Sequence, residues 1–179
     1  MESQMLIDGV LLKAYRDTVL LPDGSQSVRE WIDHPGASAV VPLFPDGSTI
    51  LVRQFRYPAR REFLEVPAGK IDVDGESPDE VAGRELEEET GWRSGLLTPL
   101  GSLYPCIGYS NEIIHFFLAE ELSPGERSLS EGEHLESVRM PFGEAVQLAA
   151  EGKLLDMKTH AALTMARSFL ALRETTTEN

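Results

Sequence analysis

Residues 69–92 read GKIDVDGESPDEVAGRELEEETGW, and this stretch decides how the rest of the chain is interpreted. It contains the signals of a helix start: Ser77 can cap free backbone amides, a proline follows at the first helical position, and Glu80 completes a capping box. Gly91 supplies a helix end. We therefore expect a loop that leads into a helix over residues 78–90.

Three carboxylates share one face of this predicted helix. Glu85, Glu88 and Glu89 are spaced at i, i+3 and i+4, while Ala82 and Leu86 line an adjacent apolar stripe. Like charges at this spacing repel each other. A hard divalent cation such as Mg²⁺ would offset the repulsion, because it takes oxygen ligands together with substrate phosphates. The alternative interpretation of such a run of charges is a solvated acidic helix face.

The pattern of acids resembles the signature of the Nudix hydrolases, which cleave nucleoside diphosphates linked to another moiety. In this chain the matching positions are Glu76, Arg84, Glu85, Leu86, Glu88, Glu89, Gly91 and Trp92. One feature departs from the family pattern, since six residues rather than the usual five separate Gly69 from Glu76. We expect the extra residue to lengthen the turn at residues 73–75 and to leave the helix unchanged.

The resemblance extends beyond the signature. Residues 52–57, 63–72, 109–112 and 156–159 look like the Nudix branch that hydrolyses ADP-ribose and other nucleoside diphosphate sugars, and the likeness covers most of residues 10–173. It implies an α/β (α+β) fold, the Nudix α/β/α sandwich with a mixed β-sheet, preceded by a small N-terminal β-strand subdomain. It also implies a homodimer formed through the N-terminal strands.

The resemblance assigns roles to the acidic helix. It implies that Glu85 and Glu89 ligate Mg²⁺, with Mn²⁺ as a substitute, and that the backbone carbonyl of Ala68 completes a site. Glu88 would help to hold a further ion and so belong to the catalytic machinery. Arg84 would orient the acids, in keeping with its position four residues before Glu88.

Relatives in this branch take the catalytic base from an acidic loop late in the chain. The matching segment makes Glu133 the expected base, with Glu131 and Glu136 as competitors, and a solvated loop acid is the alternative interpretation.

Substrate contacts are expected from Arg56, Arg53 and Glu112. The planar donor fork of Arg56 suits phosphate oxygens, whereas a solvated surface position is the alternative for most of the local arginines.

The implied reaction is Mg²⁺-dependent hydrolysis of the pyrophosphate bond of a small nucleotide sugar, giving a nucleoside monophosphate and a sugar phosphate. The alternatives are a dedicated ADP-ribose pyrophosphatase and a Nudix-fold module that senses a nucleotide sugar without cleaving it. Ile107 stands before Gly108 where relatives tuned to ADP-ribose usually carry proline, and this favours a broader range of nucleoside diphosphate sugars or a different one.

The amino-acid composition limits which binding partners and which cellular compartment we expect for the protein. The 179 residues are 41% hydrophobic and 26% charged, as in one globular domain with a small appendage. A net charge of −14 argues against nucleic acid, since phosphate-backbone binding needs a basic patch. The single cysteine, Cys106, excludes an intramolecular disulfide; we interpret it as buried, with a reactive thiol as the alternative. Because we find no membrane span or signal peptide, we expect no membrane partner and a cytoplasmic protein.

Alternation and turn residues divide the rest of the chain. Strands are expected over residues 10–21, 27–32, 37–43, 49–56, 62–66, 96–104, 112–120 and 136–140, and further helices over 141–151 and 156–173. We expect a dimer-forming β-hairpin subdomain at 1–36, a hydrolase domain at 37–173 and a frayed tail at 174–179, because an isolated pair of strands is marginal in water. Trp31 is expected to pack at the base of this hairpin, the alternative being a contact with a nucleobase or a dimer partner.

Overall fold

The computed structural model describes residues 2–129, 132 and 134–177. In chain order the strands are β1 (Glu2–Asp8), β2 (Lys13–Leu20), β3 (Gln26–Asp33), β4 (Ala37–Pro42), β5 (Ser48–Arg56), β6 (Arg61–Glu65), β7 (Ala68–Lys70), β8 (Trp92–Leu103), β9 (Ile114–Pro124) and β10 (Leu135–Pro141). The helices are α1 (Pro78–Thr90), α2 (Phe142–Ala150) and α3 (Met157–Thr177), and a 3-10 turn, η1, spans Tyr57–Ala59.

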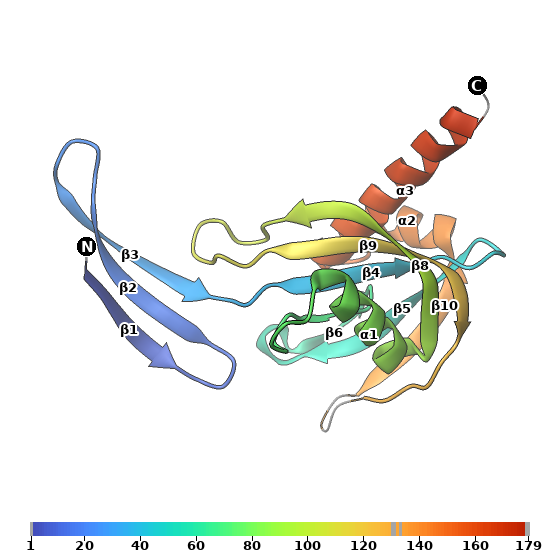
Figure 1. The fold of residues 1–179 in the computed structure, drawn as a ribbon, viewed down its shortest axis with the longest axis horizontal. Coiled ribbons are helices and arrows are strands. Elements are labelled where there is room, and N and C mark those ends of the chain that lie inside the picture. Colours follow the sequence, from blue (N-terminus) through green and yellow to red (C-terminus); the bar gives the residue numbers. More distant parts are fainter. Residues whose placement is uncertain (1, 130–131, 133, 178–179) are drawn as a thin grey trace.

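The first three strands form an antiparallel sheet, β1-β2-β3, that lies to one side of the main body (Figure 1). Inside this sheet the Trp31 ring stacks on the ring of Tyr15 with a centroid distance of 5.0 Å. The indole Nε1 of Trp31 donates a hydrogen bond to Asp17 at 2.8 Å. Trp31 therefore packs within the N-terminal strands, in agreement with the packing role expected for it.

The main body contains two further sheets. One has the order β7-β4-β9-β8, in which β4 and β9 run parallel and the remaining pairs are antiparallel. The other has the order β10-β5-β6 and is antiparallel throughout. The predicted mixed sheet is thus present, and its central strand β4 is buried along its whole length.

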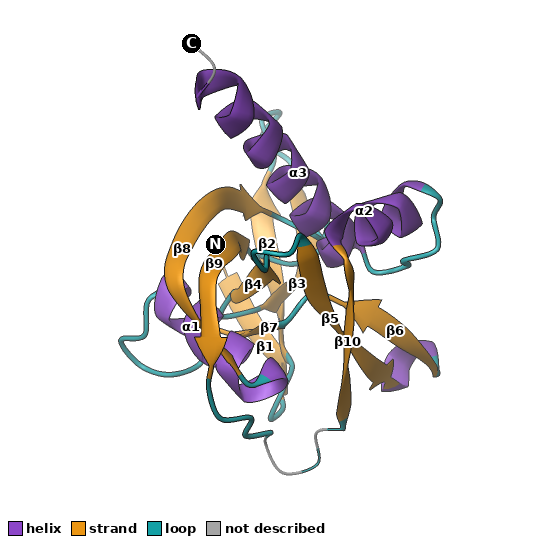
Figure 2. Ribbon diagram, turned by 90° about the vertical axis from the view of Figure 1, so that its right-hand side faces the viewer, coloured by secondary structure: helices purple, strands orange, loops and turns teal. Residues whose placement is uncertain are grey.

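Helices cover both faces of the mixed sheet (Figure 2). On one face, Val40 of β4 with Phe117 and Ala119 of β9 pack against Ala82 and Leu86 of α1. Both α1 residues are fully buried, as expected for the apolar stripe of this helix.

The other face of the same two strands builds the larger core. Val41, Phe116 and Leu118 alternate with the residues that face α1, and they share a cluster with Ala145 of α2 and Leu163 of α3. This alternation places the mixed sheet between α1 on one side and α2 and α3 on the other, which is the predicted α/β/α arrangement.

The acidic helix begins and ends at the predicted residues. The backbone N–H of Ser77 donates to Glu80 Oε2 at 2.8 Å as part of a capping box. Gly91 has a left-handed φ of 77° and its N–H donates to the carbonyl of Glu87 at 2.8 Å. Before the helix, the N–H of Glu76 donates to the carbonyl of Val73 at 3.2 Å, so a turn lies where the extra residue was expected.

Several element boundaries differ from those predicted. β1 lies in a segment where the sequence pattern predicts no element, and β8 begins at Trp92, directly after α1. Helix α3 continues to Thr177, beyond the predicted end at residue 173. The expectation of a buried Cys106 is wrong: this side chain is only half-buried, and its Sγ accepts a hydrogen bond from the Tyr109 hydroxyl at 3.2 Å.

None of the helices among the described residues is both long and apolar enough to cross a membrane.

Candidate active site

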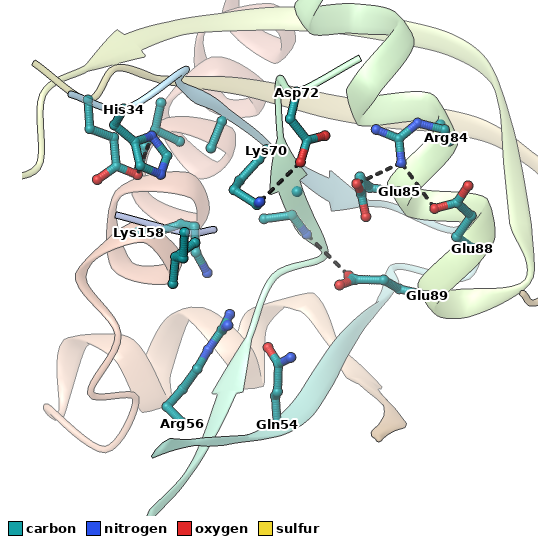
Figure 3. A pocket seen from close by; sticks show the side chains of 16 residues that line it. His34, Gln54, Arg56, Lys70, Asp72, Arg84, Glu85, Glu88, Glu89 and Lys158 are labelled. Carbon is teal, nitrogen blue, oxygen red and sulfur yellow. Dashed lines mark hydrogen bonds and ion pairs between the residues drawn. The ribbon is translucent and has the colours of Figure 1, made fainter. Parts of the chain in front are cut away.

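A cavity of about 520 Å³ opens between α1, β5, β7 and the start of α3 (Figure 3). The charged and polar side chains that line it are His34, Gln54, Arg56, Lys70, Asp72, Arg84, Glu85, Glu88, Glu89, Glu112 and Lys158. It therefore collects residues from distant parts of the chain, with the carboxylates of α1 on one wall and Arg56 and Lys158 across from them.

Arg84 organises the acidic wall. Its Nε donates to Glu76 at 2.8 Å, and its Nη1 donates to Glu85 at 2.8 Å and to Glu88 at 3.0 Å. The hydrogen bond with Glu76, together with the charges of the neighbouring acids, raises the pKa of the Arg84 guanidinium above its usual range. The guanidinium thus stays charged and forms hydrogen bonds with Glu85 and Glu88, the two acids that it is predicted to orient.

Glu89 is the most buried acid of the three, with only 5% of its surface exposed. Its Oε2 accepts a hydrogen bond from the backbone N–H of Ala68 at 3.2 Å. The structure therefore brings Glu89 and Ala68 together, and the contact between them uses the Ala68 amide.

Glycine at position 69 lets β7 approach the acidic helix. A Cβ atom built on Gly69 would lie 1.9 Å from Oε1 of Glu85, so the carboxylate occupies the space that any side chain would need. The close approach of backbone and carboxylate explains why the residue after Ala68 has no side chain.

The donor set fits a hard divalent cation. Glu85, Glu88 and Glu89 offer carboxylate oxygens on one wall of a polar cavity, and oxygen is the ligand that Mg²⁺ prefers. Among the described residues, no three His, Cys, Asp or Glu side chains already stand close enough to form a metal cluster. The three glutamates lie on one face of α1, where Arg84 holds Glu85 and Glu88 by hydrogen bonds.

The opposite wall is cationic. Gln54 and Arg56 are two residues apart on β5, so their side chains leave the same face of the strand, and both line the cavity. Arg56 is anchored from behind by two hydrogen bonds to Glu65, at 2.8 and 2.7 Å. The hydrogen bond with Glu65 raises the pKa of Arg56, so a permanent positive charge faces the acids of α1.

Arg53 lies elsewhere, on the opposite face of β5. Its Nε lies 3.2 Å from Oε2 of Glu136, and the side chains of Arg53 and Glu136 are 42% and 70% exposed. The structure places neither Arg53 nor Glu136 among the residues that line the cavity. Glu133 and Glu131, the expected base and one competitor, fall outside the described residues.

Glu112, a predicted substrate contact, lines the cavity. Its Oε1 lies 3.8 Å from Nδ1 of His34, and that nitrogen accepts the N–H of Gly36 at 3.1 Å. Ile107 is 82% exposed and is not part of the cavity wall.

Sequence reasoning missed five of the lining residues, namely His34, Gln54, Lys70, Asp72 and Lys158. The alternation of β5 could have revealed Gln54 once Arg56 was chosen. The approach of Lys158 to Arg56 depends on tertiary contacts across more than ninety positions, and no local pattern signals it.

The chain is similar to proteins of known family. The NUDIX domain family matches residues 33–161. The chain is 40% identical to an ADP-ribose pyrophosphatase of Bacillus subtilis (strain 168), over 96% of this chain and 91% of the relative. It is 35% identical to a methanol dehydrogenase activator of Bacillus methanolicus, over 97% and 92% of the two chains.

Two more similarities extend the comparison. A GDP-mannose pyrophosphatase of Yersinia enterocolitica serotype O:8 / biotype 1B is 36% identical over 79% of this chain and 78% of the relative. A crystal structure of an ADP compounds hydrolase superposes with a TM-score of 0.85 at 25% identity, covering 97% of this chain and 94% of that one.

Proposed function

This chain belongs to the Nudix hydrolase family, and we propose that it hydrolyses the pyrophosphate bond of nucleoside diphosphate sugars. The products would be a nucleoside monophosphate and a sugar phosphate. The observation that carries the proposal is the cavity that places three carboxylates of α1 across from Arg56 and Lys158. Such a cavity can hold a diphosphate between bound cations and fixed positive side chains.

The proposed cofactor is Mg²⁺, with Mn²⁺ as a substitute. Glu85, Glu88 and Glu89 would hold it with the backbone carbonyl of Ala68, in keeping with the general use of divalent metals by Nudix hydrolases. When bound, the cation neutralises the diphosphate and lowers the pKa of a water molecule. Arg84 keeps Glu85 and Glu88 in place through the hydrogen bonds described above.

The chain's own residues would do the remaining work. Arg56 would bind a phosphate oxygen with the part of its guanidinium that Glu65 does not use. Glu112, on the cavity wall, would bind the sugar portion. Glu133 is the proposed base that accepts the proton of the attacking water, with Glu131 and Glu136 as competitors. Arg53 stays a predicted substrate contact.

Turnover of a substrate panel tests the proposal. With Mg²⁺ present, we expect at least one of ADP-ribose, ADP-glucose, GDP-mannose and UDP-glucose to yield a nucleoside monophosphate and a sugar phosphate. Glu89→Gln should abolish turnover because it removes a metal ligand, whereas Glu87→Gln, on the same helix but paired with Arg93 at 2.7 Å, should not. Full Mg²⁺-dependent turnover by Glu89→Gln would show that the ligand assignment is wrong.

The same panel separates the narrower alternatives. A strict preference for ADP-ribose would agree with the name of the Bacillus subtilis relative, and cleavage of GDP-mannose with that of the Yersinia relative. Tight binding of a nucleotide sugar without product at saturating Mg²⁺ would favour a sensor over an enzyme.

We also propose that the N-terminal subdomain, residues 1–36, joins two copies of the chain. Its strands and the loop between β1 and β2 leave many large apolar side chains exposed, namely Met5, Leu6, Ile7, Val10, Leu11, Leu12, Leu20 and Val28. Exposed apolar patches of this kind mark interaction surfaces. Light scattering should give the mass of a dimer for the full chain and of a monomer for residues 37–179, and a monomeric full chain would contradict the proposal.

We propose that the protein is cytoplasmic, because its single cysteine, Cys106, is unpaired and suits a reducing compartment.

A further inference from the structure

A second cavity, of about 400 Å³, adjoins the first. Its walls are largely apolar and include Pro58, Phe63, Pro105, Leu155 and Met157. The two cavities share four lining residues, Arg56, Glu112, Ile114 and Lys158. The cationic side chains therefore stand where the two cavities meet.

A buried carboxylate holds both cations from behind. The side chain of Glu65, at the end of β6, is only 3% exposed. Its oxygens accept two hydrogen bonds from Arg56 and one from Lys158 Nζ at 2.8 Å. Burial by itself raises the pKa of Glu65, but the hydrogen bonds and charges of the two cations outweigh it and lower the pKa below the usual value.

A second carboxylate fixes the other side of Lys158. Asp156 Oδ2 accepts from Lys158 Nζ at 2.9 Å, and it also accepts from the backbone N–H of Thr159 at 2.9 Å and from its hydroxyl at 2.6 Å. The Thr159 hydroxyl oxygen in turn accepts the N–H of Val66 at 2.9 Å. The start of α3 is thereby tied to the chain just after β6, and the position of Lys158 is fixed by both.

Both cations keep hydrogen-bond donors for a ligand. Of the three donors of the Lys158 ammonium, Glu65 and Asp156 take two in the described contacts. Of the five N–H donors of Arg56, Glu65 takes two. The network has equal numbers of positive and negative groups, so it can stay buried on one side and still present fixed donors to an anion on the other.

We propose that Lys158 is a second phosphate-binding residue beside Arg56, and that Glu65 is the positioning residue that aims both side chains at the diphosphate. The diphosphate would lie at the junction of the cavities, with one of its two substituents in the polar cavity and the other in the apolar one. As regards the substrate, this inference rests on the proposed function.

Binding of inorganic pyrophosphate, measured by calorimetry at saturating Mg²⁺, tests the proposal without relying on turnover. Lys158→Met should weaken binding about tenfold, the size of one charge-assisted hydrogen bond, because it keeps the stem of the side chain and removes the charge. Glu65→Gln should weaken it by a similar factor, even though it removes a negative charge from the site. The matched controls are Lys153→Met and Glu151→Gln, since these residues form an ion pair of 2.6 Å at the surface, outside both cavities.

Affinity equal to that of the unaltered protein in Lys158→Met would overturn the role of the lysine. Unchanged or tighter binding in Glu65→Gln would show that the loss of a negative charge outweighs any positioning, and would overturn the role of Glu65. Combining Lys158→Met with Glu65→Gln should weaken pyrophosphate binding by less than the sum of the two separate free-energy losses, because Glu65 acts in part by positioning Lys158.

Kinetics with whichever nucleotide sugar the enzyme cleaves separate this inference from the proposed function. Glu65→Gln should raise KM more than it lowers kcat, a split that general loosening of the fold would not produce. If no sugar nucleotide is cleaved but pyrophosphate affinity still falls in the variants, the proposed function is wrong and the phosphate site stands. If turnover is present and pyrophosphate affinity is unaffected, the phosphate site is wrong.

Discussion

Gly69→Ala tests how tightly β7 is fitted against the acidic helix. The new methyl carbon would lie 1.9 Å from Oε1 and 2.0 Å from Cδ of Glu85, and contacts below 3.0 Å essentially never occur. The carboxylate must therefore retreat by about 1.1 Å or more. Because it ends a flexible side chain, we expect the fold to survive and the proposed metal ligand to lose its place.

The expected cost follows from that displacement. Misplacement of a reacting or ligating group by about 1 Å can cost on the order of 100-fold in rate. We therefore expect Gly69→Ala to lower kcat about 100-fold and to raise the Mg²⁺ concentration needed for half-maximal turnover. The assay is product release at increasing Mg²⁺, with circular dichroism and thermal unfolding to confirm that the fold is retained.

Gly83→Ala is the matched control, because it makes the same change inside α1. The new methyl there would have Leu97 Cδ1 as its nearest neighbour at 3.6 Å, an ordinary contact. Alanine should stabilise the helix by up to ~1 kcal/mol and leave turnover unchanged. Full turnover and an unchanged Mg²⁺ requirement in Gly69→Ala, as in this control, would contradict the importance of the position of Glu85 for catalysis.

Three further changes test separate parts of the account. Arg84→Lys should raise the half-saturating Mg²⁺ concentration about 10-fold or more, since an ammonium cannot reproduce the guanidinium's contacts with three acids; unchanged Mg²⁺ dependence would contradict this. Ser77→Ala should lower the free energy of unfolding by ~1 kcal/mol in urea titrations, because it removes the capping box, and a stability equal to that of the unaltered protein would refute the cap. Glu65 has a folded pKa below its ordinary value of 4.5, so its contribution to stability is present above that pH and is lost as the pH falls through the folded pKa. The gap in unfolding free energy between the unaltered protein and Glu65→Gln should therefore be wide at neutral pH and narrow in acid; a gap independent of pH would count against the ion network.

Local signals in the sequence were enough to predict the acidic helix and its neighbourhood. A capping serine, a helix-ending glycine and carboxylates at i, i+3 and i+4 depend only on residues within one turn of each other. The structure places Glu85, Glu88 and Glu89 on the cavity wall and buries Leu86 behind them, so both faces of α1 were correctly assigned.

Other features depend on contacts that no local pattern contains. Strand β1 is exposed along its whole length, so it shows no alternation between buried and exposed residues that would predict a strand. Arg53 and Arg56 look equivalent in the sequence, yet three positions along a strand place them on opposite faces. Lys158 lies at the site through tertiary contacts, among them its hydrogen bond to Glu65, 93 positions earlier.

The claim on which the account depends is that the acids of α1 bind divalent cations. The most direct measurement is the anomalous scattering of Mn²⁺ in crystals soaked with the ion and a non-hydrolysable substrate analogue. We expect at least one peak within ligand distance of Glu85 and Glu89, with the analogue's diphosphate beside it. Carboxylates turned toward bulk solvent at saturating Mn²⁺, with no peak beside them, would contradict the claim.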